Sequence, residues 1–383
     1  MTLDWKQLLL DIRQDEAIFG LDIGSLSVKL IQMRKDNAGY TVTAAGVAEI
    51  VAGAAETAAG VAEIAAGAAE TAAEVAEIAA WEDSEDDRKI KNTVNAISEC
   101  LRSTGIQTQL AVCGISGPEV AVRYFSFPLL PPVEIEGAVL LEATQVCPFF
   151  NVGDASTHYQ LMPNGEDKTS GILVAATNRL IKSKVQLAKT AYLDWVLMDV
   201  EGLALLNCLS EFEETKPGEA KAVLNVGNSC TTLAIMGDDS LPFIRDVAYA
   251  GNDIIEQIVT ECDVSTEAVK EILSDCEDLS QLQSEFGDGF EKACRRLTVD
   301  VSETLRYYKA QEKSGIVEKI FVCGGFALAK GFVELLDNHL PADVVLWNPF
   351  EKIRCEADQS CEEILRKNGP AMAVAAGLAM RSI

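Results

Sequence analysis

Two short stretches of the chain place a polar residue, a glycine and hydroxyl side chains at a spacing that could hold a phosphate group. The first is GLDIGSLSVKLI, residues 20–31, and the second is AVLNVGNSCTTLAI, residues 222–235. In each stretch a glycine separates two apolar runs that have the composition of strands, which predicts a β-hairpin. Glycine in such a turn lets the backbone approach a ligand without a Cβ atom in the way.

The polar residues of these turns have the chemistry that binds a chain of phosphates. Turn N–H groups and hydroxyls can donate to phosphate oxygens, and a carboxylate can hold a hydrated Mg²⁺ ion that bridges the phosphates. Asp22 is the expected Mg²⁺ residue, through water, and Lys29 adds positive charge if its side chain turns back toward the hairpin. The other candidate residues are Gly24, Ser25 and Ser27 in the first turn and Gly227, Ser229 and Thr231 in the second. Two such hairpins that face each other would hold the phosphates from both sides.

A third glycine turn lies in VEKIFVCGGFALAKGFVELLDNHL, residues 317–340. A predicted strand ends at Gly324 and Gly325, and a helix follows within a few residues, which permits close approach of a flat nucleoside. The chain has no G-x-x-x-x-G-K-[S/T] phosphate loop, and GGFALAKG does not have the spacing of a dinucleotide fingerprint. A single glycine turn is usually an ordinary tight turn, so the order of all three favours a nucleotide site.

The elements that position these turns need more than one domain. The chain has 383 residues, of which 48% are hydrophobic, enough for two or more cores. Its net charge of −27 repels phosphate backbones and anionic lipids, so we expect no nucleic-acid binding and favour basic protein segments as partners. Eleven cysteines without a C-x-x-C pair fit small buried side chains in a reducing cytoplasm. Only two histidines are present, which leaves a histidine-based zinc site or a Ser-His-Asp triad unsupported.

The N-terminal segment, MTLDWKQLLLDIRQDEAIF, carries acids early and lacks the cleavage site of a signal peptide. No apolar run in the chain approaches membrane-spanning length. Trp5, Leu8, Leu9 and Ile12 fall on one helical face. We expect a helix that docks on the body of the protein. The alternative is a membrane-surface helix, which the charge of the chain disfavours.

Residues 44–80 repeat an Ala-rich unit of 14 residues, within which the pattern recurs every seven. The heptad spacing favours a helix for much of this segment, although the first copy, in GYTVTAAGVAEI, could equally be a strand. We interpret the repeat as a surface insertion. The alternative is a helix that contacts a partner or a second copy of the chain. The acidic WEDSEDDR that follows has the composition of a solvated linker.

The three glycine motifs, in this order, resemble those of the actin, Hsp70 and sugar-kinase superfamily. DIGSLSVK is similar to the first phosphate motif, NVGNSCTTLAI to the second and FVCGGFALAKG to the adenosine motif, which adds Asn228 and Phe326 to the expected nucleotide-binding residues. LMDVEGLALLNCL and PAMAVAAGLAMRSI resemble the two connecting helices between the halves. Further segments, among them FSFPLLPPVEIEGAVLLEATQVCPF and CRRLTVDVSETLRYYKAQ, resemble the type IV pilus assembly protein PilM family, which is related to the division protein FtsA. The resemblance covers about residues 18–43 and 90–383.

This resemblance implies a duplicated actin-like (ribonuclease H-like) α/β fold with a small subdomain of the SHS2 type. The expected parts are subdomain 1A at 1–81 and 178–215, with the repeat at 44–80 inserted; SHS2-like subdomain 1C at 82–177; subdomain 2A at 216–250 and 316–383; and subdomain 2B at 251–315. Local patterns agree, because QLAVCGISGPEVAVRYFSFP predicts two strands around a Gly-Pro turn and EIEGAVLLEATQVC predicts a helix.

The resemblance also implies a role. It is that of a cytoplasmic scaffold in a type IV pilus or type II secretion-like platform, with ATP and Mg²⁺ between its halves. The groove between 1A and 1C would receive the cytoplasmic N-terminal peptide of a PilN-like inner-membrane protein. The chain would reach the inner face of the inner membrane only through such partners, with other platform proteins as further contacts. One alternative is an FtsA-like filament-forming division protein, although the sequence stops at Ile383 without a basic amphipathic helix. Another is a sugar-kinase-like enzyme, for which no catalytic Asp stands out.

Two residues decide whether hydrolysis is expected. The second phosphate motif of the family usually carries an acid where this chain has Asn225, and an amide neither carries negative charge nor accepts a proton from water. Glu201 aligns with an acid that positions the attacking water in some superfamily members, and its alternative interpretation is an acid favoured at a helix start. We expect ATP to bind and to be hydrolysed slowly or not at all.

Overall fold

The computed structural model describes residues 17–37, 39–51, 85–147, 153–162, 168–214, 216–237, 241–311 and 315–381. The expected N-terminal helix, and the copies of the repeat after residue 51, lie outside these residues. No helix in the described ranges combines the length and the hydrophobicity needed to cross a membrane.

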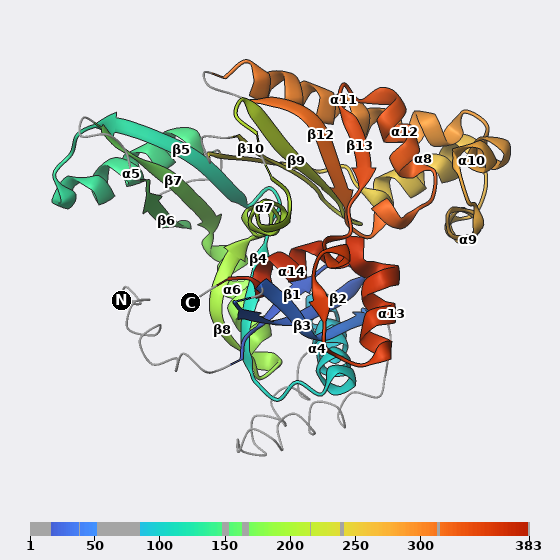
Figure 1. The fold of residues 1–383 in the computed structure, drawn as a ribbon, viewed down its shortest axis with the longest axis horizontal. Coiled ribbons are helices and arrows are strands. Elements are labelled where there is room, and N and C mark those ends of the chain that lie inside the picture. The colour runs from blue at the N-terminus through green and yellow to red at the C-terminus, as the bar shows by residue number, and fades with distance from the viewer. Residues whose placement is uncertain are drawn as a thin grey trace.

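The first half of the molecule is built on a mixed six-stranded sheet (Figure 1). In spatial order its strands are β14 (Arg354–Cys355), β3 (Gly39–Glu49), β2 (Ser27–Asp36), β1 (Phe19–Ile23), β4 (Leu110–Ile115) and β8 (Asp194–Val200). Strands β1, β2 and β3 form an antiparallel meander, and β4 and β8 extend the sheet in parallel on the other side of β1. The predicted hairpin around Gly24 is confirmed as the β1–β2 pair.

The second half repeats this topology in a five-stranded sheet. Its spatial order is β11 (Pro242–Val247), β10 (Thr231–Gly237), β9 (Glu219–Val226), β12 (Ile316–Cys323) and β13 (Asp343–Leu346). Again the first three strands along the chain are antiparallel, and two parallel strands follow on the far side of the first. The hairpin around Gly227 is the β9–β10 pair, in the same place as β1–β2. The duplication predicted from the two motifs is therefore confirmed.

Two helices lie between the halves (Figure 1). They are α7 (Glu201–Phe212) and α14 (Ala373–Ala379), and a 3₁₀ turn, η3 (Gly369–Met372), leads into α14. A Cβ on Gly377 would lie 2.2 Å from the carbonyl oxygen of Ala204, so the two backbones touch at a point that only glycine allows. A buried apolar cluster joins both helices to strands of both sheets.

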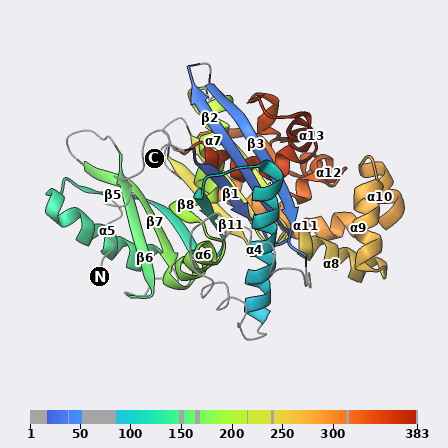
Figure 2. The same cartoon turned by 90° about the horizontal axis from the view of Figure 1, so that it is seen from below.

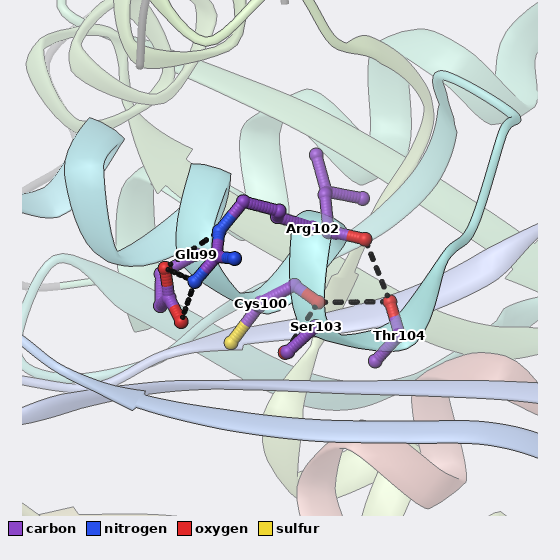
Figure 3. Close-up of polar contacts among 6 residues, drawn as sticks. Glu99, Cys100, Arg102, Ser103 and Thr104 are labelled. Carbon is purple, nitrogen blue, oxygen red and sulfur yellow. Dashed lines mark hydrogen bonds and ion pairs between the residues drawn. The ribbon is translucent and has the colours of Figure 1, made fainter. Parts of the chain in front are cut away.

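Besides α14, three described helices pack on the first sheet. They are α4 (Glu85–Thr104), α6 (Asn178–Thr190) and α13 (Gln359–Asn368). The last turn of α4 lies against β3 at Gly46, where a Cβ would be 2.7 Å from Cγ2 of Thr104. In that turn the hydroxyls of Ser103 and Thr104 donate to the carbonyl of Cys100 at 3.1 and 2.8 Å, and Arg102 pairs with Glu99 (Figure 3). The two hydroxyls thus add side-chain hydrogen bonds to a backbone carbonyl in the last turn of the helix.

The first six residues of the Ala-rich repeat, 44–49, are part of β3 and not of a helix. It pairs along β2, and the strand interpretation is confirmed there. Sheet pairing overrides the helical preference of alanine because it satisfies the backbone along its whole length.

Five helices accompany the second sheet: α8 (Gly251–Cys262), α9 (Thr266–Asp275), α10 (Leu279–Phe286), α11 (Gly289–Lys309) and α12 (Phe332–His339). Two short 3₁₀ turns flank the α12–β13 segment: η1 (Phe326–Leu328) precedes α12, and η2 (Pro349–Glu351) follows β13. The five helices share one core with the sheet. The helices predicted from GNDIIEQIV and from ACRRLTVDVSETLRYYKAQ are confirmed as α8 and α11.

A third unit lies to one side of both halves (Figures 1 and 2). It is an antiparallel sheet with the order β5 (Val120–Pro128), β7 (Lys168–Thr177) and β6 (Ala155–Leu161), and helix α5 (Pro132–Val146) packs on it. Its small core includes Phe125, Val139 and Leu173. The range 82–177, expected as subdomain 1C, also contains α4 and β4. Strand β4 is part of the six-stranded sheet, and α4 packs on that sheet. The division into four subdomains stays a prediction.

Candidate functional site

The turns of the two hairpins have the same local geometry. The N–H of Gly24 donates to the carbonyl of Ser27 at 3.1 Å, and the N–H of Gly227 donates to the carbonyl of Cys230 at 3.1 Å. A Cβ on Gly227 would lie 2.8 Å from that Cys230 oxygen, closer than side chains approach backbone. The second turn therefore requires glycine on steric grounds.

The two turns face each other across the space between the halves. The side-chain amide of Asn228 donates to Oγ of Ser25 at 3.5 Å, although the residues are 203 positions apart in the chain. Ser25 and Ser229 are both exposed. Exposed hydroxyls from both halves thus lie where the two turns come together, the arrangement that the two motifs predict.

Lys29 turns back to the first hairpin. Its Nζ atom donates to Oδ2 of Asp22 at 3.0 Å and lies 3.1 Å from where a Cβ of Gly24 would be. Asp22 is only 7% exposed, so this pair is largely shielded from water. A positive and a negative side chain therefore lie together directly beneath the glycine turn.

Glu201 stands at the start of α7, close to Asp22. The pKa of its carboxyl is raised to about 7, mainly by burial and next by the charge of Asp22, while Lys184 and a hydrogen bond with the Ser116 side chain oppose the shift. A Cβ on Gly114 would lie 2.8 Å from Cγ of Glu201, so the acid packs tightly over the end of β4. A carboxyl that titrates near neutral pH can accept or release a proton under working conditions.

Asp246 on β11 is a residue of this region that the sequence analysis did not select. Its carboxylate accepts from the hydroxyl of Thr232 at 2.6 Å and from the N–H of Gly117 at 2.7 Å, and burial raises its pKa. Gly117 belongs to the loop between β4 and β5 and has a φ of +95°. Asp246 therefore joins the second half to the loop that carries the three-stranded sheet. The strand PFIRDV places Asp246 next to Arg245, and no local pattern marks this acid as a residue of the site.

The start of α8 supports the second turn. The N–H groups of Gly251 and Asn252 donate to the carbonyls of Gly227 and Asn228 at 3.0 and 2.8 Å. The first N–H groups of a helix have no partner within it. These bonds therefore give two such N–H groups an acceptor and also hold the second turn in place.

The third glycine motif packs against the second hairpin. Gly324 has a φ of +97°, and a Cβ there would lie 2.4 Å from the carbonyl of Val226 and 2.6 Å from Oδ1 of Asn225. Gly325 is exposed, with no other group within 4 Å of its Cβ position. Of the two glycines, Gly325 is the one with open space beside it, which a flat ligand needs.

Two expected site residues are buried behind the second hairpin and the third glycine motif. Thr231 is fully buried and donates to the carbonyl of Tyr249 at 2.8 Å. Phe326 is buried, with its ring centroid 4.9 Å from that of Phe332. A third, Ser27, is the first residue of β2, and its carbonyl closes the Gly24 turn.

The donor set fits a magnesium ion only together with phosphate and water. Within the described ranges no three His, Cys, Asp or Glu side chains are grouped closely enough to hold a metal ion. Asp22 has one oxygen paired with Lys29, and Asn225 is half-buried beside Cys323. Because Mg²⁺ keeps several waters and takes ligands from nucleotide phosphates, one carboxylate at this position is sufficient.

The family model described as type IV pilus assembly protein PilM matches residues 68–383. Among solved structures, the PilM-PilN type IV pilus biogenesis complex is similar over 95% of this chain and 98% of that chain, with a TM-score of 0.72 and 22% identity. A diol dehydratase-reactivating factor in nucleotide free form is similar over 95% and 99%, with a TM-score of 0.51 and 11% identity. Ethanolamine utilization protein EutJ from Carboxydothermus hydrogenoformans is similar over 96% and 90%, with a TM-score of 0.49 and 14% identity.

Proposed function

The chain belongs to the type IV pilus assembly protein PilM family and has the duplicated actin-like fold, and from this premise we propose that it is a nucleotide-binding scaffold of a pilus assembly platform. The observation that carries the nucleotide part is the contact between Ser25 and Asn228, which brings the two glycine turns together. ATP would place its phosphates between these turns and its nucleoside beside Gly325. Asp22 would hold Mg²⁺ through water, and Lys29 would balance charge.

Calorimetric titration with ATP and Mg²⁺ tests this proposal. We expect the unmodified chain to bind, and Gly227→Ala to bind at least about tenfold more weakly, because its Cβ would lie 2.8 Å from the Cys230 carbonyl and distort the turn. Gly137→Ala in α5 is the matched control, since nothing lies within 4 Å of its Cβ position. Absence of binding by the unmodified chain, or equal binding by both variants, would contradict the proposal.

The partner part of the proposal rests on the relative that was solved as a PilM-PilN complex. We propose that this chain binds the cytoplasmic N-terminal segment of a PilN-like inner-membrane protein in the groove expected between subdomains 1A and 1C. It would thereby be held at the inner face of the inner membrane together with other platform proteins. A net charge of −27 favours a segment with basic residues.

A pull-down with a synthetic N-terminal peptide of the neighbouring PilN-like protein tests the partner part. We expect capture of the full chain by this peptide and not by the same residues in scrambled order. If the chain binds nucleotide but neither peptide, the scaffold role in this form is wrong while the nucleotide site stands.

A further inference from the structure

Outside the nucleotide cleft, a groove of about 1150 Å³ lies between the three-stranded sheet and the second half. Its walls come from β5 on one side and from β11 and the end of α11 on the other. Strand β5 is the outer strand of its sheet, and β11 is the outer strand of the five-stranded sheet. Two strand edges therefore border one groove, and an extended chain can add to such an edge through backbone hydrogen bonds.

The hydrogen-bond pattern of β5 shows which of its backbone groups face outward. The N–H of Thr177 donates to the carbonyl of Glu119 at 3.1 Å, which makes that pair a hydrogen-bonded one. Because bonded and non-bonded pairs alternate in an antiparallel ladder, Val122, Tyr124 and Ser126 point their N–H and C=O groups away from β7. All three residues line the groove.

The groove is positively charged, in contrast to the chain as a whole. Arg123, Lys168 and Arg245 line it, and within the described ranges none of them forms an ion pair with a carboxylate. The acid among the lining residues is Asp246, whose two oxygens already accept hydrogen bonds. In a chain with a net charge of −27, three cations gathered without acidic partners attract a negatively charged occupant.

Aromatic side chains complete the walls. Tyr124 is 44% exposed and Tyr307 is 59% exposed, and the ring of Phe243 lies 5.9 Å from that of Tyr307. Alternate side chains of an added strand point to opposite sides, so aromatic and cationic surfaces can be contacted by one segment.

We propose that this groove binds an acidic, extended segment of a partner protein, which pairs with the outward edge of β5 at Tyr124 and Ser126 and places carboxylates beside Arg123, Lys168 and Arg245. This occupant differs in charge from the basic segment proposed for the PilN-like partner. The proposal therefore adds a second protein-binding site to the scaffold.

Selection from a display library of random peptides, about twelve residues long, on the immobilised full chain tests the site. We expect enriched sequences to contain acidic residues alternating with apolar ones. They should bind the Lys168→Glu/Arg245→Glu variant at least about tenfold more weakly. They should bind Lys270→Glu as they bind the unmodified chain, since Lys270 is exposed on α9 outside the groove. Thermal unfolding of each variant checks that the fold is retained.

Two further measurements separate this occupant from others. An enriched peptide N-methylated at alternate positions should lose binding in only one of the two registers, because a strand that adds to an edge uses alternate N–H groups. The proposal is overturned if no peptide is enriched, if enriched peptides are not acidic, or if they bind the double variant undiminished. It is also overturned if a single-stranded oligonucleotide binds the unmodified chain and displaces the peptide, because the cations would then serve nucleic acid.

Discussion

At the scale of single residues, Glu201 is the carboxyl whose surroundings most change its chemistry. Its pKa is raised to about 7 from an ordinary value of 4.5, first by burial and then by Asp22. The folded protein thus holds this proton to higher pH than the unfolded chain does, so the contribution to stability is fully present below about pH 4.5 and is lost as pH rises through about 7.

Unfolding by urea at a series of pH values measures this effect. We expect the unfolding free energy of the unmodified protein, minus that of Glu201→Gln, to fall between pH 4.5 and about 7 and to level off above that range. Taking the difference removes the titration of groups that do not interact with Glu201. A difference that does not change with pH would show that Glu201 titrates normally.

The second prediction at this scale concerns Asn225 and the rate of ATP hydrolysis. Phosphate release from ATP and Mg²⁺ should be slow for the unmodified chain and rise about tenfold or more in Asn225→Asp, since a carboxylate can hold hydrated Mg²⁺ and accept a proton. Asn338→Asp adds the same charge at an exposed position on α12 and should leave the rate unchanged. Rapid magnesium-dependent hydrolysis by the unmodified chain would contradict the expectation.

The sequence alone selects residues whose proposed role is local. Gly24 and Gly227 could be found because each turn and its two strands are contiguous in the chain. Asp246 could not, because its importance comes from Gly117, which reaches it only when β11 and the β4–β5 loop are brought together. The burial of Thr231 was hidden for the same reason, since its partner Tyr249 lies beyond the next strand.

At the scale of elements, the contact of α4 with β3 depends on Gly46. Gly46→Ala would place Cβ 2.7 Å from Cγ2 of Thr104, and we expect a loss of about 1–3 kcal/mol in unfolding free energy. Thr104→Ser removes that methyl group and keeps the hydroxyl. The double variant should therefore recover much of the loss caused by Gly46→Ala in urea unfolding. Strictly additive effects would show that the two groups do not meet.

Element types followed from sequence where the pattern and the tertiary setting agree. Helices α8 and α11 have apolar faces that bury in the core of the second half, so periodicity was sufficient. The start of the repeat is the contrasting case. Its residues 44–49 follow the heptad pattern of an Ala-rich helix, yet they lie in strand β3 and pair with β2. No local pattern reveals which partner strand is available.

At the scale of the whole molecule, the two halves meet where α7 crosses α14. Gly377→Ala would bring Cβ within 2.2 Å of the Ala204 carbonyl, and we expect a loss of at least about 2 kcal/mol in unfolding free energy together with weaker binding of ATP. Gly325→Ala, where nothing lies within 4 Å, should change unfolding free energy by less than about 0.5 kcal/mol. If Gly377→Ala had the same unfolding free energy as the unmodified protein, the close contact of α7 with α14 would not contribute to stability.

The duplicated architecture was predictable because the hairpin motif occurs twice at corresponding points of the chain. The position of the three-stranded sheet was not, because strands β4 and β5 are separated by one short loop yet belong to different sheets. The groove beside β5 forms because the chain passes from one sheet to another between β4 and β5. No local sequence pattern predicts that change.

The carboxylate of Asp246 has a consequence for how the two sites communicate. It is held by Thr232, next to the second glycine turn, and by Gly117, at the base of the groove. If a ligand at one site moves β11 away from the Gly117 loop, it breaks the Asp246–Gly117 bond and thereby changes the free energy of binding at the other site. Thermodynamic reciprocity then requires that whatever factor ATP applies to the affinity of the peptide, the peptide applies to the affinity of ATP.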